Sequence, residues 1–196
     1  MKKRTFAILL LTVTGLAACK KDSVKPTVTQ TNVNRKVVTT ITGLNAADTV
    51  SENVTGYIRL QLAQDSVNTD NILIDFKPNS STAFVVNEDA PTLKGFGLVS
   101  LSSLSSDSKA LAINTLPLTG KGATIALAVS AKSTGTYKLN LVTTNNIPAV
   151  FNIWLKDNLK KDSVNFRTSP SYSFNLNTAD ATTFGNQRFS LVLSQK

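Results

Sequence analysis

The stretch that decides the fold reads Tyr57-Ile58-Arg59-Leu60-Gln61-Leu62, and beyond a turn at residues 68–71 it continues as Ile72-Leu73-Ile74-Asp75-Phe76. Every second side chain in both halves is apolar, so the hydrophobic period is two rather than 3.6. Successive side chains of an extended strand point to opposite faces. The two halves therefore predict two strands, each with one face packed against a core.

The same period of two continues almost to the end of the chain, interrupted by short clusters of Gly, Asn, Ser, Thr and Pro. About ten short strands, with no long stretch of helical period, are typical of an all-β protein, and one apolar face per strand favours an antiparallel β-sandwich of jelly-roll or Greek-key-like arrangement. Residues 98–106 fit either a strand or a short helical turn. The other core-facing positions that the pattern predicts are Val37, Thr39, Ile41, Leu111, Ile113, Ile125, Leu127, Val129, Tyr137, Leu139, Leu141, Phe151, Ile153, Leu155, Val164, Phe166, Tyr172, Phe174, Leu176, Phe189, Leu191 and Leu193.

The N-terminal residues have the three parts of a secretory signal: a cationic start, an apolar run over residues 5–16, and small residues before Cys19. The apolar run is shorter than the roughly 20 residues that a membrane-spanning helix needs. Leu16-Ala17-Ala18-Cys19 resembles the lipobox of bacterial lipoproteins. The resemblance implies cleavage between Ala18 and Cys19 and a covalent diacylglyceryl and acyl lipid on Cys19.

An ordinary thiol near the cleavage site is the alternative for Cys19. Lipidation is favoured because the chain has one Cys, which leaves no intramolecular disulfide partner for an exposed thiol in an oxidising compartment. Two or more acyl chains anchor a protein stably. Lys20-Lys21-Asp22, with Lys directly after the Cys, resembles the outer-membrane pattern and the surface-export tract of Bacteroidetes lipoproteins. We expect an outer-membrane location, facing the periplasm or the cell surface.

The domain organisation that follows has three parts. Residues 1–18 form the lipoprotein signal peptide, residues 19–36 the lipidated N-terminus with a flexible tether, and residues 37–196 the β-sandwich domain. The tether is predicted from its polar composition, its Pro and the absence of a helical stripe. The alternative is that its second half forms a first edge strand.

The net charge of +9 is not accompanied by a sequence pattern typical of nucleic-acid binding. The sequence contains no run of five or more like charges and no basic motif interleaved with aromatic residues, which a nucleic-acid footprint requires. We read the basicity as a solvated surface. The expected partners are the membrane, through the lipid, and a surface protein or a glycan, but no nucleic acid.

Five motifs in the second half follow one another in an order that resembles the β-sandwich module near the C-termini of large secreted Bacteroidetes proteins, just before a type IX secretion sorting domain. The resemblance covers roughly residues 70–193 and implies architecture rather than chemistry. We expect that no sorting domain follows here and that lipid takes its place. The motifs are Leu111-Ala112-Ile113-Asn114-Thr115-Leu116-Pro117-Leu118, Gly135-Thr136-Tyr137-Lys138-Leu139, Trp154-Leu155-Lys156-Asp157-Asn158, Ser171-Tyr172-Ser173-Phe174 and Arg188-Phe189-Ser190-Leu191-Val192-Leu193.

The residue inventory disfavours an enzyme. The chain has no His, which removes Ser-His and Cys-His nucleophile pairs and His-ligated metals, and its only Glu residues are Glu52 and Glu88. Carboxylate oxygens of Glu88, Asp89 and Asp70, with amide oxygens of Asn87 and Asn71, are candidates for a calcium site, which needs about six to eight oxygens. The favoured alternative is that these are solvated turn residues, so no cofactor beyond the lipid is expected.

Two aromatic residues are candidates for stacking on a sugar ring. Trp154, the only Trp, alternates with Ile153 and Leu155, which are predicted to face the core, so its ring is predicted to point outward. Tyr57 is a weaker candidate for the same reason. Burial of Trp154 under a loop or the partner sheet is the interpretation we favour. For Asp157 and Arg188, a turn-capping carboxylate and a strand-start cation, the family pattern predicts a structural ion pair.

Two functions follow. The first is a non-catalytic lipoprotein of the outer membrane or cell surface whose sandwich is an interaction or structural module. The second is a glycan-binding surface lipoprotein of a polysaccharide uptake system. A groove or flat face that exposes Trp154 with Tyr57, or Asn and Asp, beside it favours the second function. A Trp154 wholly packed in the core removes the best residue for it.

Overall fold

The computed structural model describes residues 27–33, 36–42, 54–93, 95 and 97–196, and it divides the chain into two units, 1–46 and 47–196. In the first unit, β1 (Thr27–Val33) and β2 (Lys36–Thr42) form an antiparallel two-stranded sheet. The second half of the predicted tether at residues 19–36 is therefore strand, because its alternating β-branched residues favour extended pairing. The strand predicted at Val37 pairs with β1 rather than joining the sandwich.

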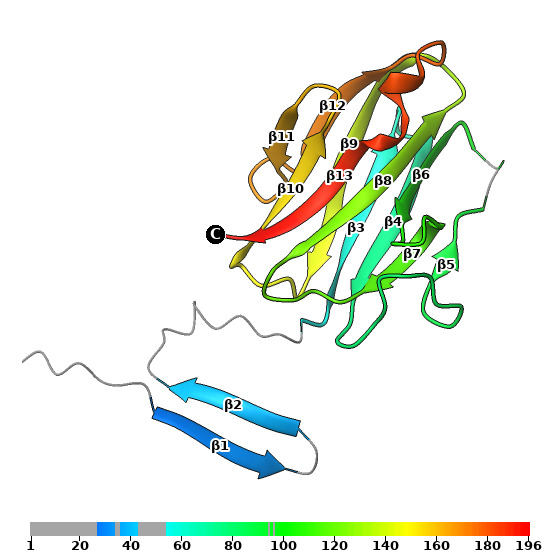
Figure 1. The fold of residues 1–196 in the computed structure, drawn as a ribbon. Coiled ribbons are helices and arrows are strands. Elements are labelled where there is room, and N and C mark those ends of the chain that lie inside the picture. The colour runs from blue at the N-terminus through cyan, green and yellow to red at the C-terminus, as the bar shows by residue number, and fades with distance from the viewer. Residues whose placement is uncertain (1–26, 34–35, 43–53, 94, 96) are drawn as a thin grey trace, which may run out of the picture. The chain divides into compact units, whose positions relative to one another are not determined.

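The second unit contains an eleven-stranded sheet, which confirms the predicted all-β class (Figure 1). The strand order is β11-β10-β13-β8-β6-β7-β4-β3-β9-β12, with β5 paired to β7. All pairs are antiparallel except β4 with β7. The strands are β3 (Gly56–Ala63), β4 (Thr69–Phe76), β5 (Ala90–Pro91), β6 (Val99–Leu104), β7 (Ala110–Leu116), β8 (Ala123–Ala131), β9 (Gly135–Asn145), β10 (Phe151–Asp157), β11 (Asp162–Asn165), β12 (Ser171–Leu176) and β13 (Gly185–Gln195), with a short 3-10 helix, η1 (Ala181–Thr183), before β13.

The sheet folds over on itself into two layers (Figure 1). One layer carries β11, β10, β13, β8 and β6, and the other carries β7, β4, β3, β9 and β12. Strands that follow one another along the chain, such as β8, β9 and β10, alternate between the layers. Inner side chains of both layers form one hydrophobic core, so the second unit is a β-sandwich whose layers are joined along the β6–β7 side.

Most of the predicted core positions are buried. Ile58, Leu60 and Leu62 on β3 and Phe151 on β10 are each 0% exposed. Residues 98–106 contain strand β6 rather than a helical turn. Ile113, predicted to face the core, is instead 38% exposed, because the alternation breaks on β7, where Asn114 and Thr115 are both buried.

The predicted ion pair between Asp157 and Arg188 is present and buried at the open side of the folded sheet. Arg188 Nη2 lies 3.0 Å from Asp157 Oδ2, and each side chain is 1% exposed. Arg188 and its neighbour Phe189 are both buried, although neighbours on a regular strand face opposite ways. A β-bulge between Gly185 and Phe189 resolves this by turning Arg188 inward, and Gly185 adopts a φ of +90° that favours glycine.

The guanidinium of Arg188 joins the two layers. It donates to Asp157 on β10 and, 2.8 Å away, to the carbonyl oxygen of Asn175 on β12 in the opposite layer. The rings of Phe174 and Phe189 flank the cation at 4.8 and 4.7 Å. Tyr172 on β12 donates its hydroxyl to Asp157 Oδ2 at 3.1 Å. We call these residues the edge clasp.

The edge clasp shifts the pKa values of its acidic groups in opposite directions. Burial and the charge of Asp157 raise the pKa of Tyr172 to about 12. Burial by itself would raise the pKa of Asp157, but the hydrogen bond from Arg188, together with other hydrogen bonds and the Arg188 charge, lowers it below 3.8. The stabilising effect of the Asp157 carboxylate is therefore complete above about pH 4 and is lost as the pH falls through its native pKa.

Removal of the Arg188 cation should be far more costly than removal of an exposed one. Arg188→Met leaves Asp157 charged and buried, so we expect a loss of about 3–5 kcal/mol in the free energy of unfolding, measured by urea denaturation. Lys77→Met is the control, because Lys77 pairs with Asp75 at 3.2 Å but is 49% exposed; its loss should stay below about 1 kcal/mol.

The double variant Arg188→Met/Asp157→Leu removes both charges of the edge clasp. It should lose less than the sum of the two single variants, because no unpaired charge remains. Equal losses for Arg188→Met and Lys77→Met would show that the edge clasp does not hold the layers together.

Candidate functional site

The acidic residues considered for calcium are not gathered around a common point. Asp70 Oδ2 accepts the Leu101 amide at 2.8 Å. Asp89 accepts the amides of Val85 and Thr115, both at 2.7 Å. Over the described residues, no three Asp, Glu, Cys or His side chains form a group that could hold a metal ion. Asp70 and Asp89 tie loops and strands together instead.

The remaining predicted site residues are placed as follows. Glu88 is exposed, beside the buried Asp89. Ala18, Cys19 and Glu52 lie outside the described residues, so the signal cleavage and the lipidation stay predictions. Among the helices in the described part of the chain, none has the length and apolar character needed to cross a membrane.

Trp154 lies on the outer face of β10 and is partly exposed. The favoured interpretation, in which a loop or the partner sheet buries this side chain, is therefore not what the structure shows; Ile153 and Leu155 on either side of it face the core. Tyr57, also partly exposed, lies on the outer face of β3 in the opposite layer. The two aromatic residues thus belong to separate surfaces and do not form one site.

The surroundings of Trp154 are polar and mostly uncharged. Across the strands it is paired with Asn165 on β11 and Val192 on β13. Asn165 donates its side-chain amide to the Asn152 side chain at 3.1 Å, and Asn152 lies two residues from Trp154 on the same outer face. The indole therefore stands beside a pair of amide side chains. We call this surface the Trp154 face.

A cavity of about 580 Å³ lies where the two layers join, at the seam between β6 and the pair β4 and β7. The cavity forms because β6 pairs with β7 only through Ser103–Leu111 and Leu104–Ala110, while the other end of β6 follows β8. β7 instead continues beside β4. The strands diverge, and Thr92, Leu93, Gly95, Gly97 and Leu98 border the opening.

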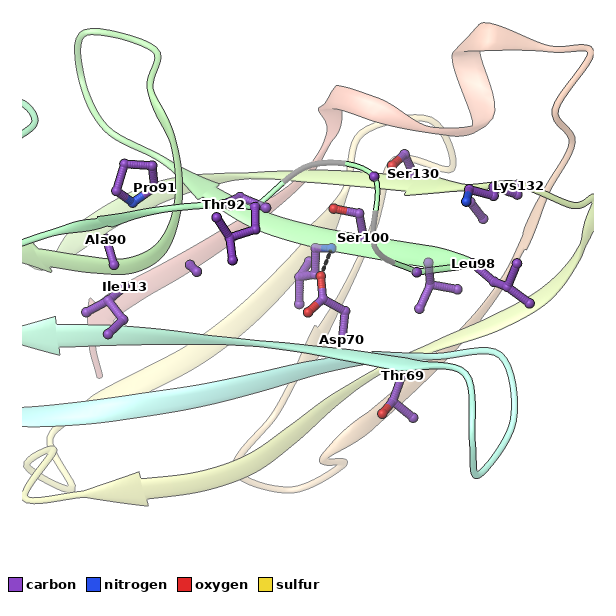
Figure 2. A pocket seen from close by; sticks show the side chains of 17 residues that line it. Thr69, Asp70, Ala90, Pro91, Thr92, Leu98, Ser100, Ile113, Ser130 and Lys132 are labelled. Atoms are coloured by element: carbon purple, nitrogen blue, oxygen red, sulfur yellow. Dashed lines mark hydrogen bonds between the residues drawn. The ribbon is translucent and has the colours of Figure 1, made fainter.

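The chemistry of this seam cavity changes along its length. Figure 2 shows Ala90, Pro91 and Ile113 at one end and Ser130 and Lys132 at the other. The Asp70 side chain lies between them and bridges to the backbone of β6. One end of the cavity is apolar, whereas the other presents a hydroxyl and an ammonium group beside the apolar side chain of Leu98.

The sequence pattern did not predict the seam cavity. Two features of the sequence lie at the cavity. The pattern left the structure of the Leu98–Ser106 segment open, and it placed Ile113 in the core. Both lie at the seam, where pairing between strands that are distant in sequence decides which side chains are covered. A break in alternation at Asn114-Thr115 was the local signal that Ile113 faces outward.

The second unit is thus an all-β sandwich that carries a concave, partly apolar cavity at its seam and, separately, the Trp154 face. Comparison with protein-family models, with curated proteins and with solved structures finds no match. The functional argument therefore depends on the residues of this chain.

The outward position of Trp154 gives a stability test. Trp154→Ala should lower the free energy of unfolding by only about 1 kcal/mol, because much of the ring is outside the core. Phe151→Ala, three residues earlier on the inner face, should cost about 3–5 kcal/mol. Chemical denaturation measures both, and acrylamide should quench the fluorescence of Trp154 in the native state. Equal losses for the two variants would place Trp154 in the core.

Proposed function

We propose that this protein is a lipid-anchored, non-catalytic binding module of the bacterial outer membrane, with Cys19 as its lipidated first residue and the β-sandwich as the binding domain. The observation that carries the proposal is Leu16-Ala17-Ala18-Cys19, which follows an apolar run and contains the only Cys of the chain. The domain faces the periplasm or the cell surface.

The distribution of carboxylates supports a binding rather than a catalytic role. Paired-carboxylate chemistry needs two side chains that are free to take part in proton transfer. Asp70, Asp89 and Asp157 each accept backbone amides, and the chain has no His. These groups stabilise the fold.

The lipid anchor is tested by metabolic labelling. In a bacterial host with the lipoprotein pathway, labelled palmitate should be incorporated into the parent chain and into the control Ser23→Ala, but not into Cys19→Ser. Cys19→Ser should also leave the membrane fraction, because it lacks the acyl chains. If Cys19→Ser remains in the membrane fraction as the parent does, the anchor is not at Cys19.

The second candidate function is glycan binding, and the geometry of the Trp154 face favours it. An aromatic ring offers a flat apolar surface to the C–H face of a sugar, and the paired amides of Asn152 and Asn165 can donate to and accept from its hydroxyls. Lys156 is the charged side chain nearest along the outer face of β10. This combination fits a neutral or weakly anionic polysaccharide.

Glycan binding is tested with the mature chain carrying Cys19→Ser, which avoids detergent. On a glycan array, Trp154→Ala should lose binding by tenfold or more, since stacking on the indole is removed. Tyr57→Ala is the matched control, because Tyr57 is a partly exposed aromatic residue on the opposite layer; its binding should be unchanged. If both variants bind as the parent does, the Trp154 face is not a glycan site.

A further inference from the structure

We propose that a neutral glycan chain bound at the Trp154 face extends across β13 and β8 into a second, smaller cavity, which holds one of its sugar units. This inference rests on the proposed glycan binding and adds to it the direction of the chain and a second place of contact. The cavity has a volume of about 370 Å³, which lies within the roughly 300–1,000 Å³ of small-molecule sites. Asn114 on β7 lines it, so we call it the Asn114 cavity.

The Asn114 cavity forms where β8 begins with a partner on one side only. β8 pairs with β13 from Ala123 onward, whereas β6 pairs with β8 only from Leu127. The segment Thr124–Ala126 therefore borders the cavity, and β7 adds Asn114 and Leu116 to the lining. A strand that is paired on one side leaves backbone N–H and C=O groups free on the other, so this stretch of β8 offers donors and acceptors to a ligand.

Asn114 supplies a carboxamide that the fold uses only in part. The residue is 3% exposed, and its Nδ2 donates one long hydrogen bond of 3.5 Å to the Leu104 carbonyl oxygen. Among the described residues, Thr92 Oγ1 is the only buried side-chain nitrogen or oxygen atom that lacks both a hydrogen bond and contact with solvent. Asn114 Oδ1, which accepts no hydrogen bond from those residues, is therefore open to solvent. A sugar hydroxyl that reaches the carboxamide can donate to Oδ1.

The rest of the lining suits an uncharged sugar. Every residue that lines the Asn114 cavity is described, and none of them carries a charge. Ser108 and Thr124 add hydroxyl groups, while Leu104 and Ile125 add apolar surface. A sugar unit presents C–H groups and hydroxyls together, so it can use both kinds of surface. Desolvating an ion without a charged partner is costly, which disfavours a charged ligand.

Pairing across the sheet connects the Asn114 cavity with Trp154. Trp154 on β10 is opposite Val192 on β13, and Val192 is opposite Thr124 on β8 (Figure 1). Because directly opposite residues carry their side chains on the same face, these three form one row on the outer face, and Thr124 also lines the cavity. The row covers two strand spacings, roughly 10 Å. A sugar unit of an extended chain is about as long as one spacing, so several linked sugars reach the cavity and a disaccharide does not.

Dependence on chain length tests the proposal. The mature chain with Cys19→Ser is titrated with disaccharides and hexasaccharides of glucose, mannose, xylose and galactose, and the fluorescence of the only Trp reports binding. At least one hexasaccharide should bind tenfold or more tightly than its disaccharide. Asn114→Leu, which keeps the side-chain size but removes the polar atoms, should weaken that hexasaccharide by about five- to tenfold. Thr115→Val is the matched control, because Thr115 is the next buried polar residue of β7 and does not line the cavity; its affinity should stay within twofold.

Ala126→Phe narrows the Asn114 cavity from β8 and provides the test if Asn114→Leu does not fold. It should weaken hexasaccharide binding by tenfold or more, whereas Ala128→Phe, on the same outer face of β8 but outside the cavity lining, should not. If Trp154→Ala loses hexasaccharide binding in calorimetry while Asn114→Leu and Ala126→Phe bind as the parent does, glycan binding stands and the cavity proposal is overturned. If the parent binds none of these sugars, or Trp154→Ala binds them equally well, both proposals are overturned.

Discussion

The fold depends on one buried ion pair at the open side of a folded sheet. A sheet that folds over without closing keeps two strand edges, and unpaired edges expose backbone groups. Arg188 joins the two layers at this open side, since its planar guanidinium can donate to Asp157 on one layer and to the Asn175 carbonyl on the edge strand of the other at the same time. Two apolar side chains of similar volume would fill the space but would leave the Asn175 carbonyl without its donor.

The opposite side of the sandwich is joined by backbone pairing, and this pairing is incomplete. β6 and β7 share two residue pairs before they diverge, and the Asp70 carboxylate spans part of the gap by accepting the Leu101 amide. One carboxylate side chain offers less apolar surface than a paired strand would. The gap is therefore bridged but not filled. The seam cavity is thus a consequence of where the two layers part.

The sequence predicted what depends on local alternation and missed what depends on distant pairing. The strand at Ile58–Leu62 and the buried face of Phe151–Leu155 follow from period two alone. The Asp157–Arg188 pair was expected from the order of family-like motifs, but the bulge that turns Arg188 inward was not. Ile113 was misplaced because its exposure depends on β6 leaving β7. Trp154 was misplaced because the pattern of β10 does not say whether anything covers its outer face.

Strand β8 relates the two candidate surfaces. Its last residues, Ser130 and Ala131, line the seam cavity, while Thr124 near its start is paired with Val192, the β13 neighbour of Trp154. Both ends are fixed by pairing with β13 and β6, and the inner side chains between them are buried in the core. A one-residue slide of β8 in its register would turn every inner side chain outward. The Trp154 face and the seam cavity are therefore held apart by one strand whose register is fixed at both ends.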